Sequence, residues 1–149
     1  MNRLVSRTLA VVLGLSAIHA FAQTAAPNPV LDAAAKEPGA VVSKTGLIFR
    51  SLKDGAGASP TAADTVKVHY KGTFPDGKEF DSSYSRGTPI EFPLGRVIPC
   101  WTEGVQRMKV GGKAKLTCPS QIAYGERGAG GVIPPNATLL FEVELLGIK

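Results

Sequence analysis

The chain has little of what acid, base or metal chemistry needs. Its 149 residues include only two cysteines and two histidines, with no Cys-x-x-Cys pair and no cluster of histidines. This scarcity leaves no ligand set for a metal site, and we expect neither a metal nor a cofactor. There is also no glycine-rich phosphate loop, no paired-carboxylate signature and no nucleophile with a recognisable base, which argues against phosphoryl and acyl transfer.

Charge of one sign is not concentrated anywhere in the chain. Seventeen Lys and Arg residues against twelve Asp and Glu residues give a formal net charge of +5. The densest basic group is Lys109, Lys113 and Lys115, which alternate along an expected strand. That pattern fits a solvated face better than a nucleic-acid footprint, so we expect no nucleic-acid partner.

A hydrophobic run long enough to span a bilayer is also missing. The apolar stretch 9–18 is too short for a membrane helix. It follows Arg3 and Arg7 and precedes small residues ending at Ala22, which is the order of a secretory signal peptide. We expect cleavage after Ala22, no stable membrane insertion, and a periplasmic or secreted mature protein; the alternative is an uncleaved anchor.

The rest of the chain divides into two parts. Residues 23–43 are rich in Ala and Pro without a sustained apolar period, and they predict a linker or disordered lead-in. Residues 44–149 show apolar positions with a period of two, broken by turn residues, as in short strands. These alternating stretches are 66–70, 90–94, 114–118 and 139–145.

One segment has the period of a helix instead. Trp101, Val105 and Met108 lie at i, i+4 and i+7, on one helix face. Pro99 is tolerated at the helix start, and Gly111-Gly112 is expected to end the helix. The patterns together predict an α+β fold in which a curved antiparallel sheet wraps around one short α-helix.

An acid next to an aromatic ring marks the stretch "FPDGKEFDSSYSRGTPIEFPLG". Asp81 directly follows Phe80, and the residues around them favour turns. One interpretation places Asp81 in a pocket; the alternative is a turn residue that caps the backbone of Ser82 and Ser83. Farther along, Val132-Ile133 form an apolar loop tip, which indicates a contact surface.

Four stretches of the chain resemble the FKBP family of peptidyl-prolyl cis-trans isomerases. The resemblance runs from about residue 46 to residue 149, in the family's order and spacing. The exported context and the "VIPCW" stretch resemble the bacterial periplasmic branch, including the macrophage-infectivity-potentiator type. The stretches are "VHYKGTFPDGKEFDSS", "VIPCW", "WTEGVQRMKVGGKAKL" and "AYGERGAGGVIPPNATLLFEVELL".

The resemblance implies a role for each matching residue. Trp101 is expected to form a pocket floor, and Tyr124 to donate its hydroxyl to a substrate carbonyl. Asp81 corresponds to the pocket acid and Arg86 to its basic partner. The other implied positions are the aromatic walls Tyr70, Phe80 and Phe141, the backbone contacts Val97 and Ile98, the wall residue Ile90, and the loop contacts Val132 and Ile133.

The activity implied is isomerisation of X-Pro bonds in unfolded or proline-containing polypeptides, with the macrolides tacrolimus and rapamycin as pocket ligands. The alternative is a chaperone-like holdase that uses the same pocket, and a third hypothesis is an anchored structural protein. Three departures from the family bear on substrate preference and macrolide affinity. They are Ile90 in place of an aromatic residue, a shortened connection between Gly95 and Val97, and the small pair Ala129-Gly130.

Both cysteines lie in the part of the chain that we expect to be exported. Cys118 is on the inward face of its strand, and Cys100 is at the start of the helix beneath that sheet. Export and this orientation predict an intramolecular disulfide. The alternative is two buried free thiols that pack as small hydrophobic groups.

Overall fold

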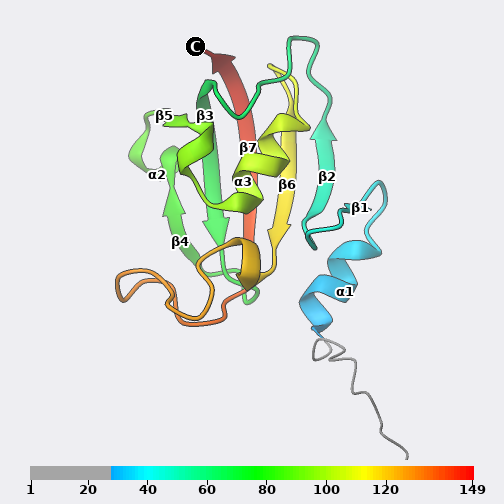
Figure 1. Cartoon of the computed structure of the whole chain (residues 1–149), viewed down its shortest axis with the longest axis vertical. Coiled ribbons are helices and arrows are strands. Elements are labelled where there is room, and N and C mark those ends of the chain that lie inside the picture. The colour runs from blue at the N-terminus through cyan, green and yellow to red at the C-terminus, as the bar shows by residue number, and fades with distance from the viewer. Residues whose placement is uncertain (1–27) are drawn as a thin grey trace, which may run out of the picture.

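The computed structural model describes residues 28–149, and its main body is one antiparallel sheet curved around a short helix (Figure 1). The strand order is β1-β2-β6-β7-β3-β4, and β5 pairs separately with β3. The sheet stays open. A single antiparallel sheet that curves around a short helix confirms the predicted α+β class. The strands are β1 (Val41–Val42), β2 (Ile48–Lys53), β3 (Thr65–Thr73), β4 (Glu79–Ser82), β5 (Ile90–Pro93), β6 (Lys113–Cys118) and β7 (Leu139–Ile148).

Strand β7 is central because every second residue is apolar and buried. Leu139, Val143 and Leu145 are 0% exposed and Phe141 is 4% exposed. The strand pairs with β6 on one side and with β3 on the other. Burial of these side chains against the helix supplies the main apolar contacts of the domain.

The helix inside the sheet is α3 (Pro99–Gln106). Its Gly104 packs against Leu116 of β6, and a Cβ atom at residue 104 would lie 2.8 Å from a Leu116 methyl carbon. Glycine therefore lets the helix approach the sheet closely. The other helices are α1 (Pro29–Ala35), α2 (Ser83–Arg86) and the short 3-10 turns η1 (Leu94–Arg96) and η2 (Ser120–Ile122).

Helix α3 ends earlier than its sequence predicts. It stops at Gln106, whereas we expected Gly111-Gly112 to end it. The amide of Arg107 bonds the carbonyl of Gly104 at 3.1 Å, and the amide of Met108 bonds that of Val105 at 3.1 Å. These i→i+3 bonds tighten the last turn and close the helix. Met108 lies beyond the helix end but is still buried. The helical period of apolar residues in the sequence therefore extends past the last residue of the helix.

A disulfide joins Cys100 of α3 to Cys118 of β6, with the two Cα atoms 5.9 Å apart. Both residues are 0% exposed. The pairing agrees with the sequence analysis and leaves no free thiol in the described residues. It ties the first turn of the helix to the sheet, directly beside Trp101.

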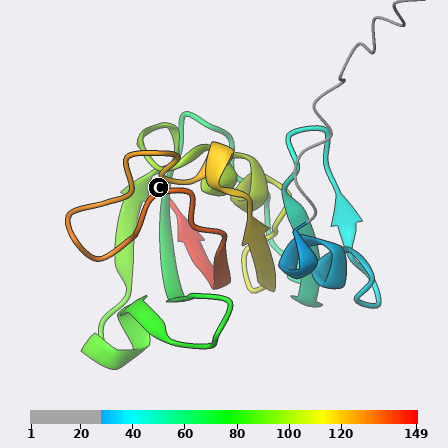
Figure 2. The same ribbon diagram turned by 90° about the horizontal axis from the view of Figure 1, so that it is seen from below.

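The segment before β2 differs from its prediction as a disordered lead-in. Helix α1 lies on the opposite face of the sheet from α3 (Figure 2). Asn28 accepts from the amide of Val30 at 3.1 Å and donates to the hydroxyl of Thr138 at 3.0 Å. Glu37 pairs with Arg50 at 2.8 Å and with Lys115 at 2.7 Å. The helix is held by polar contacts to distant residues, which no local apolar period reveals.

The predicted signal peptide, residues 1–22, lies outside the described residues. Between residues 28 and 149, the structure has no helix that is long and apolar enough to cross a membrane.

Reduction of the disulfide should destabilise the domain without removing its fold. The bridge closes a sequence separation of 18 residues, and a loop of that size contributes roughly 2–4 kcal/mol, mainly by restricting the unfolded chain. We expect urea unfolding with reductant to show this loss. The Cys100→Ala/Cys118→Ala double variant should show the same loss and no further response to reductant. Uptake of two alkylating groups by the unfolded, unreduced protein would contradict the bridge.

Candidate active site

An aromatic pocket opens between the sheet and the start of α3. Its volume is about 540 Å³, within the usual range for pockets that hold a small ligand or a peptide side chain. Four strands, two helices and the segment between β5 and α3 all contribute to its wall. The lining residues are Tyr70, Phe80, Asp81, Arg86, Ile90, Phe92, Arg96, Val97, Ile98, Trp101, Tyr124 and Phe141.

Trp101 is the centre of the aromatic packing. Its ring meets those of Tyr70, Phe92 and Phe141 edge to face, with centroid distances of 5.2, 5.5 and 5.5 Å. Phe80 meets Phe141 in the same way at 5.6 Å. Edge-to-face pairs fix ring orientation beyond what burial alone requires. The pocket floor is therefore a rigid apolar surface, formed before any ligand arrives.

Gly72 of β3 makes room for one pocket wall. A Cβ atom at this position would lie 2.5 Å from the ring of Phe80 and 3.0 Å from that of Phe141. Any larger residue would push these rings out of place. Sequence analysis did not single out Gly72, although a glycine inside a strand often marks a close approach of this kind.

Asp81, Tyr70 and Arg86 form the polar edge of the pocket. The phenol of Tyr70 donates to one carboxylate oxygen of Asp81, and the guanidinium of Arg86 donates to the other. Arg86 also donates to the Tyr70 oxygen at 3.1 Å. Burial of Asp81 disfavours its ionised form, yet the bonds from Tyr70 and Arg86 outweigh burial and lower the pKa of Asp81. The carboxyl is thus ionised at neutral pH.

The two phenols of the pocket differ in their partners. Burial, and then the bond to Asp81, raises the pKa of Tyr70. Burial, and then the charge of Asp81, raises the pKa of Tyr124. The Tyr124 hydroxyl has no hydrogen-bond partner among residues 28–149, and the residue is partly exposed, at 39%. It is a protonated donor that faces the pocket and is available to a ligand.

The structure brings together all but two of the residues expected at the site. Ile133 is 6% exposed and belongs to the core, where its backbone pairs with Ala129 at 2.9 and 3.0 Å. Val132 is 57% exposed. Neither lines the pocket, because the turn around Gly130 directs one side chain inward and the next to solvent.

Two lining residues were missed by sequence analysis. Phe92 lies two residues after Ile90 on β5, and therefore on the same strand face. That spacing could have identified it. Arg96 is the last residue of η1, next to Val97. No pattern in the sequence around it indicated that it would line the pocket.

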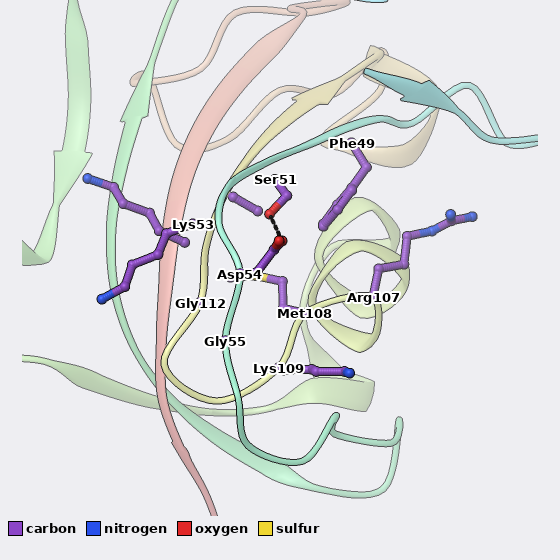
Figure 3. Close-up of a pocket in the computed structure, with 11 residues that line it drawn as sticks. Phe49, Ser51, Lys53, Asp54, Gly55, Arg107, Met108, Lys109 and Gly112 are labelled. Carbon is purple, nitrogen blue, oxygen red and sulfur yellow. Dashed lines mark hydrogen bonds between the residues drawn. The ribbon is translucent and has the colours of Figure 1, made fainter. Parts of the chain in front are cut away.

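A second cavity, of about 290 Å³, lies at the other end of α3 (Figure 3). Inside it, the hydroxyl of Ser51 donates to Asp54 at 2.7 Å. Lys53 points to one side of the cavity, whereas Arg107 and Lys109 point to the other. The cationic groups do not converge, so this cavity lacks the arrangement of a binding site. Within residues 28–149, no three His, Cys, Asp or Glu side chains are grouped as metal ligands.

Comparison with known proteins gives consistent matches. The family profile of FKBP-type peptidyl-prolyl cis-trans isomerases matches residues 57–146. The chain is 55% identical over 115 residues to the FKBP-type peptidyl-prolyl cis-trans isomerase FkpA of Escherichia coli K12, covering 77% of this chain and 42% of the relative. It is 52% identical over 106 residues to FK506-binding protein 1 of Dictyostelium discoideum, covering 70% of this chain and 99% of the relative.

A solved structure gives the same family match. The crystal structure of FkpA from Escherichia coli matches with a TM-score of 0.78 at 52% identity, covering 80% of this chain and 55% of that one. In the sequence comparison, the matched region spans 42% of the Escherichia coli FkpA sequence, which is less than half its length.

The pKa of Asp81 should respond to its two partners. We expect Tyr70→Phe and Arg86→Gln each to raise it toward the ordinary carboxyl value, measured by carbon NMR titration of the carboxyl. Because folding lowers this pKa, its stabilisation is present above the unfolded value and is lost as pH falls through the folded value. Arg107→Gln, the same charge change at the other end of α3, should leave Asp81 unchanged. An equal shift in all three variants would contradict a local effect.

Proposed function

Because this chain belongs to the family of FKBP-type peptidyl-prolyl cis-trans isomerases, we propose that it accelerates rotation about X-Pro bonds in polypeptides. The observation that carries the proposal is the preformed aromatic pocket of about 540 Å³. Its walls are apolar rings, and its one carboxylate is occupied by Tyr70 and Arg86. A prolyl ring is an apolar group that such a pocket accepts.

The reaction requires only a change of environment. Amide resonance opposes rotation with a barrier of ~18–20 kcal/mol, and X-Pro exchange therefore takes tens of seconds or more. The twisted amide has lost resonance and is less polar than the planar form, which water solvates better. An apolar pocket removes that preference and favours the twisted form. Each ~1.4 kcal/mol of differential stabilisation is about tenfold in rate.

Tyr124 supplies the polar contact in this proposal. Its hydroxyl stays protonated at neutral pH, since burial raises its pKa, and it donates to a carbonyl of the bound segment. The other pocket phenol, Tyr70, already donates to Asp81. Asp81 acts on the substrate indirectly: it fixes Tyr70 and, through it, the wall of the pocket.

The proposed clients are unfolded or newly exported polypeptides, met in the periplasm or outside the cell. Two features support this location. Residues 1–22 have the composition of a signal peptide. The Cys100–Cys118 disulfide also suits an oxidising compartment.

Three substitutions should lower kcat/KM for an X-Pro peptide. Tyr124→Phe removes one hydrogen bond of about 0.5–1.5 kcal/mol, and should cost roughly two- to tenfold. Asp81→Leu should also lower kcat/KM, because it frees Tyr70 and Arg86. Phe141→Ala should lower it and cost about 3–5 kcal/mol of stability, because it truncates a buried ring. NMR exchange measures the rates, and circular dichroism checks the fold. Wild-type rates in all three variants would refute the site.

A proline-free client separates this proposal from a holdase. The isomerase proposal fails if wild type gives no acceleration of X-Pro exchange while suppressing aggregation equally for clients with and without proline.

Tacrolimus or rapamycin should occupy the pocket and inhibit catalysis. The name of the Dictyostelium relative, FK506-binding protein 1, supports this expectation. Calorimetry should detect binding to wild type, and Phe141→Ala should weaken it. Ile90→Phe supplies the aromatic wall residue and should tighten drug binding. Neither heat nor inhibition at micromolar drug would contradict the prediction.

A further inference from the structure

The pocket wall carries one charge that has no ion-pair partner among residues 28–149. Its charged residues are Asp81, Arg86 and Arg96. Asp81 and Arg86 are bound to each other and cancel. The Arg96 guanidinium makes no hydrogen bond or ion pair within residues 28–149, and residues 1–27 contain no Asp or Glu. The wall of the pocket is therefore positive at Arg96.

The turn that carries Arg96 is anchored at Leu94, two residues earlier. Leu94, at the start of η1, is fully buried. Its amide bonds the carbonyl of Asp64 at 2.9 Å, and its carbonyl accepts from the hydroxyl of Thr102 at 2.7 Å. The acid of the preceding strand, Glu91, is paired with Lys149 at 2.7 Å. Arg96 thus extends an exposed cation from an anchored turn at the pocket wall.

The chain runs extended immediately after Arg96. Val97 has φ −103° and ψ 176°, and Ile98 has φ −56° and ψ 146°. Both line the pocket. An extended peptide beside this stretch advances ~3.3 Å per residue. A carboxylate one or two residues from the bound proline therefore comes within reach of the Arg96 side chain.

We propose that Arg96 is a specificity-determining residue that favours X-Pro segments with an Asp or Glu close to the proline. The inference rests on the proposed isomerase activity and adds a substrate class to it. An exposed charge pair of this kind changes kcat/KM by about two- to fivefold, and salt screens it.

The test uses peptide pairs that differ only in Glu or Gln, placed at each of the two positions on either side of the X-Pro unit. NMR exchange gives kcat/KM. The fluorescence of Trp101, the only tryptophan in the chain, gives Kd. At one or more positions we expect wild type to prefer Glu by about two- to fivefold at low salt, with the preference shrinking as the Debye length falls to ~3 Å at 1 M.

Variants of Arg96 test whether this side chain causes the preference for Glu. Arg96→Gln should abolish it, Arg96→Lys should retain part of it, and Arg96→Glu should reverse it. Lys53→Gln, an equal charge change at the second cavity, should retain it in full. A Glu-to-Gln ratio of one in wild type at every position overturns the inference, and so does a ratio that Arg96→Gln leaves intact.

Failure of the underlying activity has a different signature. If wild type accelerates neither the Glu nor the Gln peptides, the isomerase proposal fails. The ratio of Kd values in wild type and Arg96→Gln then decides the role of Arg96 independently of catalysis.

Discussion

The pocket depends on how closely α3 packs against the sheet at Trp101. One indole touches three other rings edge to face, each contributed by a different strand. Gly104 permits the close approach, and one turn earlier the Cys100–Cys118 bridge holds the start of the helix to β6. Because these constraints converge within a few residues, the floor is rigid without any ligand. The same contacts that stabilise the core also form the binding surface.

The polar edge of the pocket is held by hydrogen bonds rather than by aromatic packing. A carboxylate beside an apolar pocket would normally attract water, but each oxygen of Asp81 already accepts a hydrogen bond, one from Tyr70 and the other from Arg86. This arrangement keeps the pocket apolar while fixing the orientation of a wall residue. Within the part of the chain that the structure describes, Tyr124 is the pocket phenol without a hydrogen-bond partner, and Arg96 is the pocket charge without an ion-pair partner. One polar group and one charge are thus presented to a ligand, on otherwise hydrophobic surroundings.

The N-terminal segment shows where local patterns lack information. Helix α1 is seven residues long, and its anchors are Asn28 to Thr138 and Glu37 to Arg50 and Lys115. These contacts join residues far apart in the sequence. A segment that is stabilised in this way has no apolar period of its own, so its composition resembles that of a linker.

The sequence by itself determined the fold class, the central strand β7 and the helix at Trp101, since each depends on a local period of apolar residues. It also identified most of the pocket through resemblance to a family. Tertiary structure alone decided that the rings of Phe80 and Phe141 lie against Gly72 and that Arg96 lines the pocket. It also decided that Ile133 belongs to the core, and that α3 ends at Gln106. Each of these depends on which distant residue lies opposite, and spacing along one chain does not encode that.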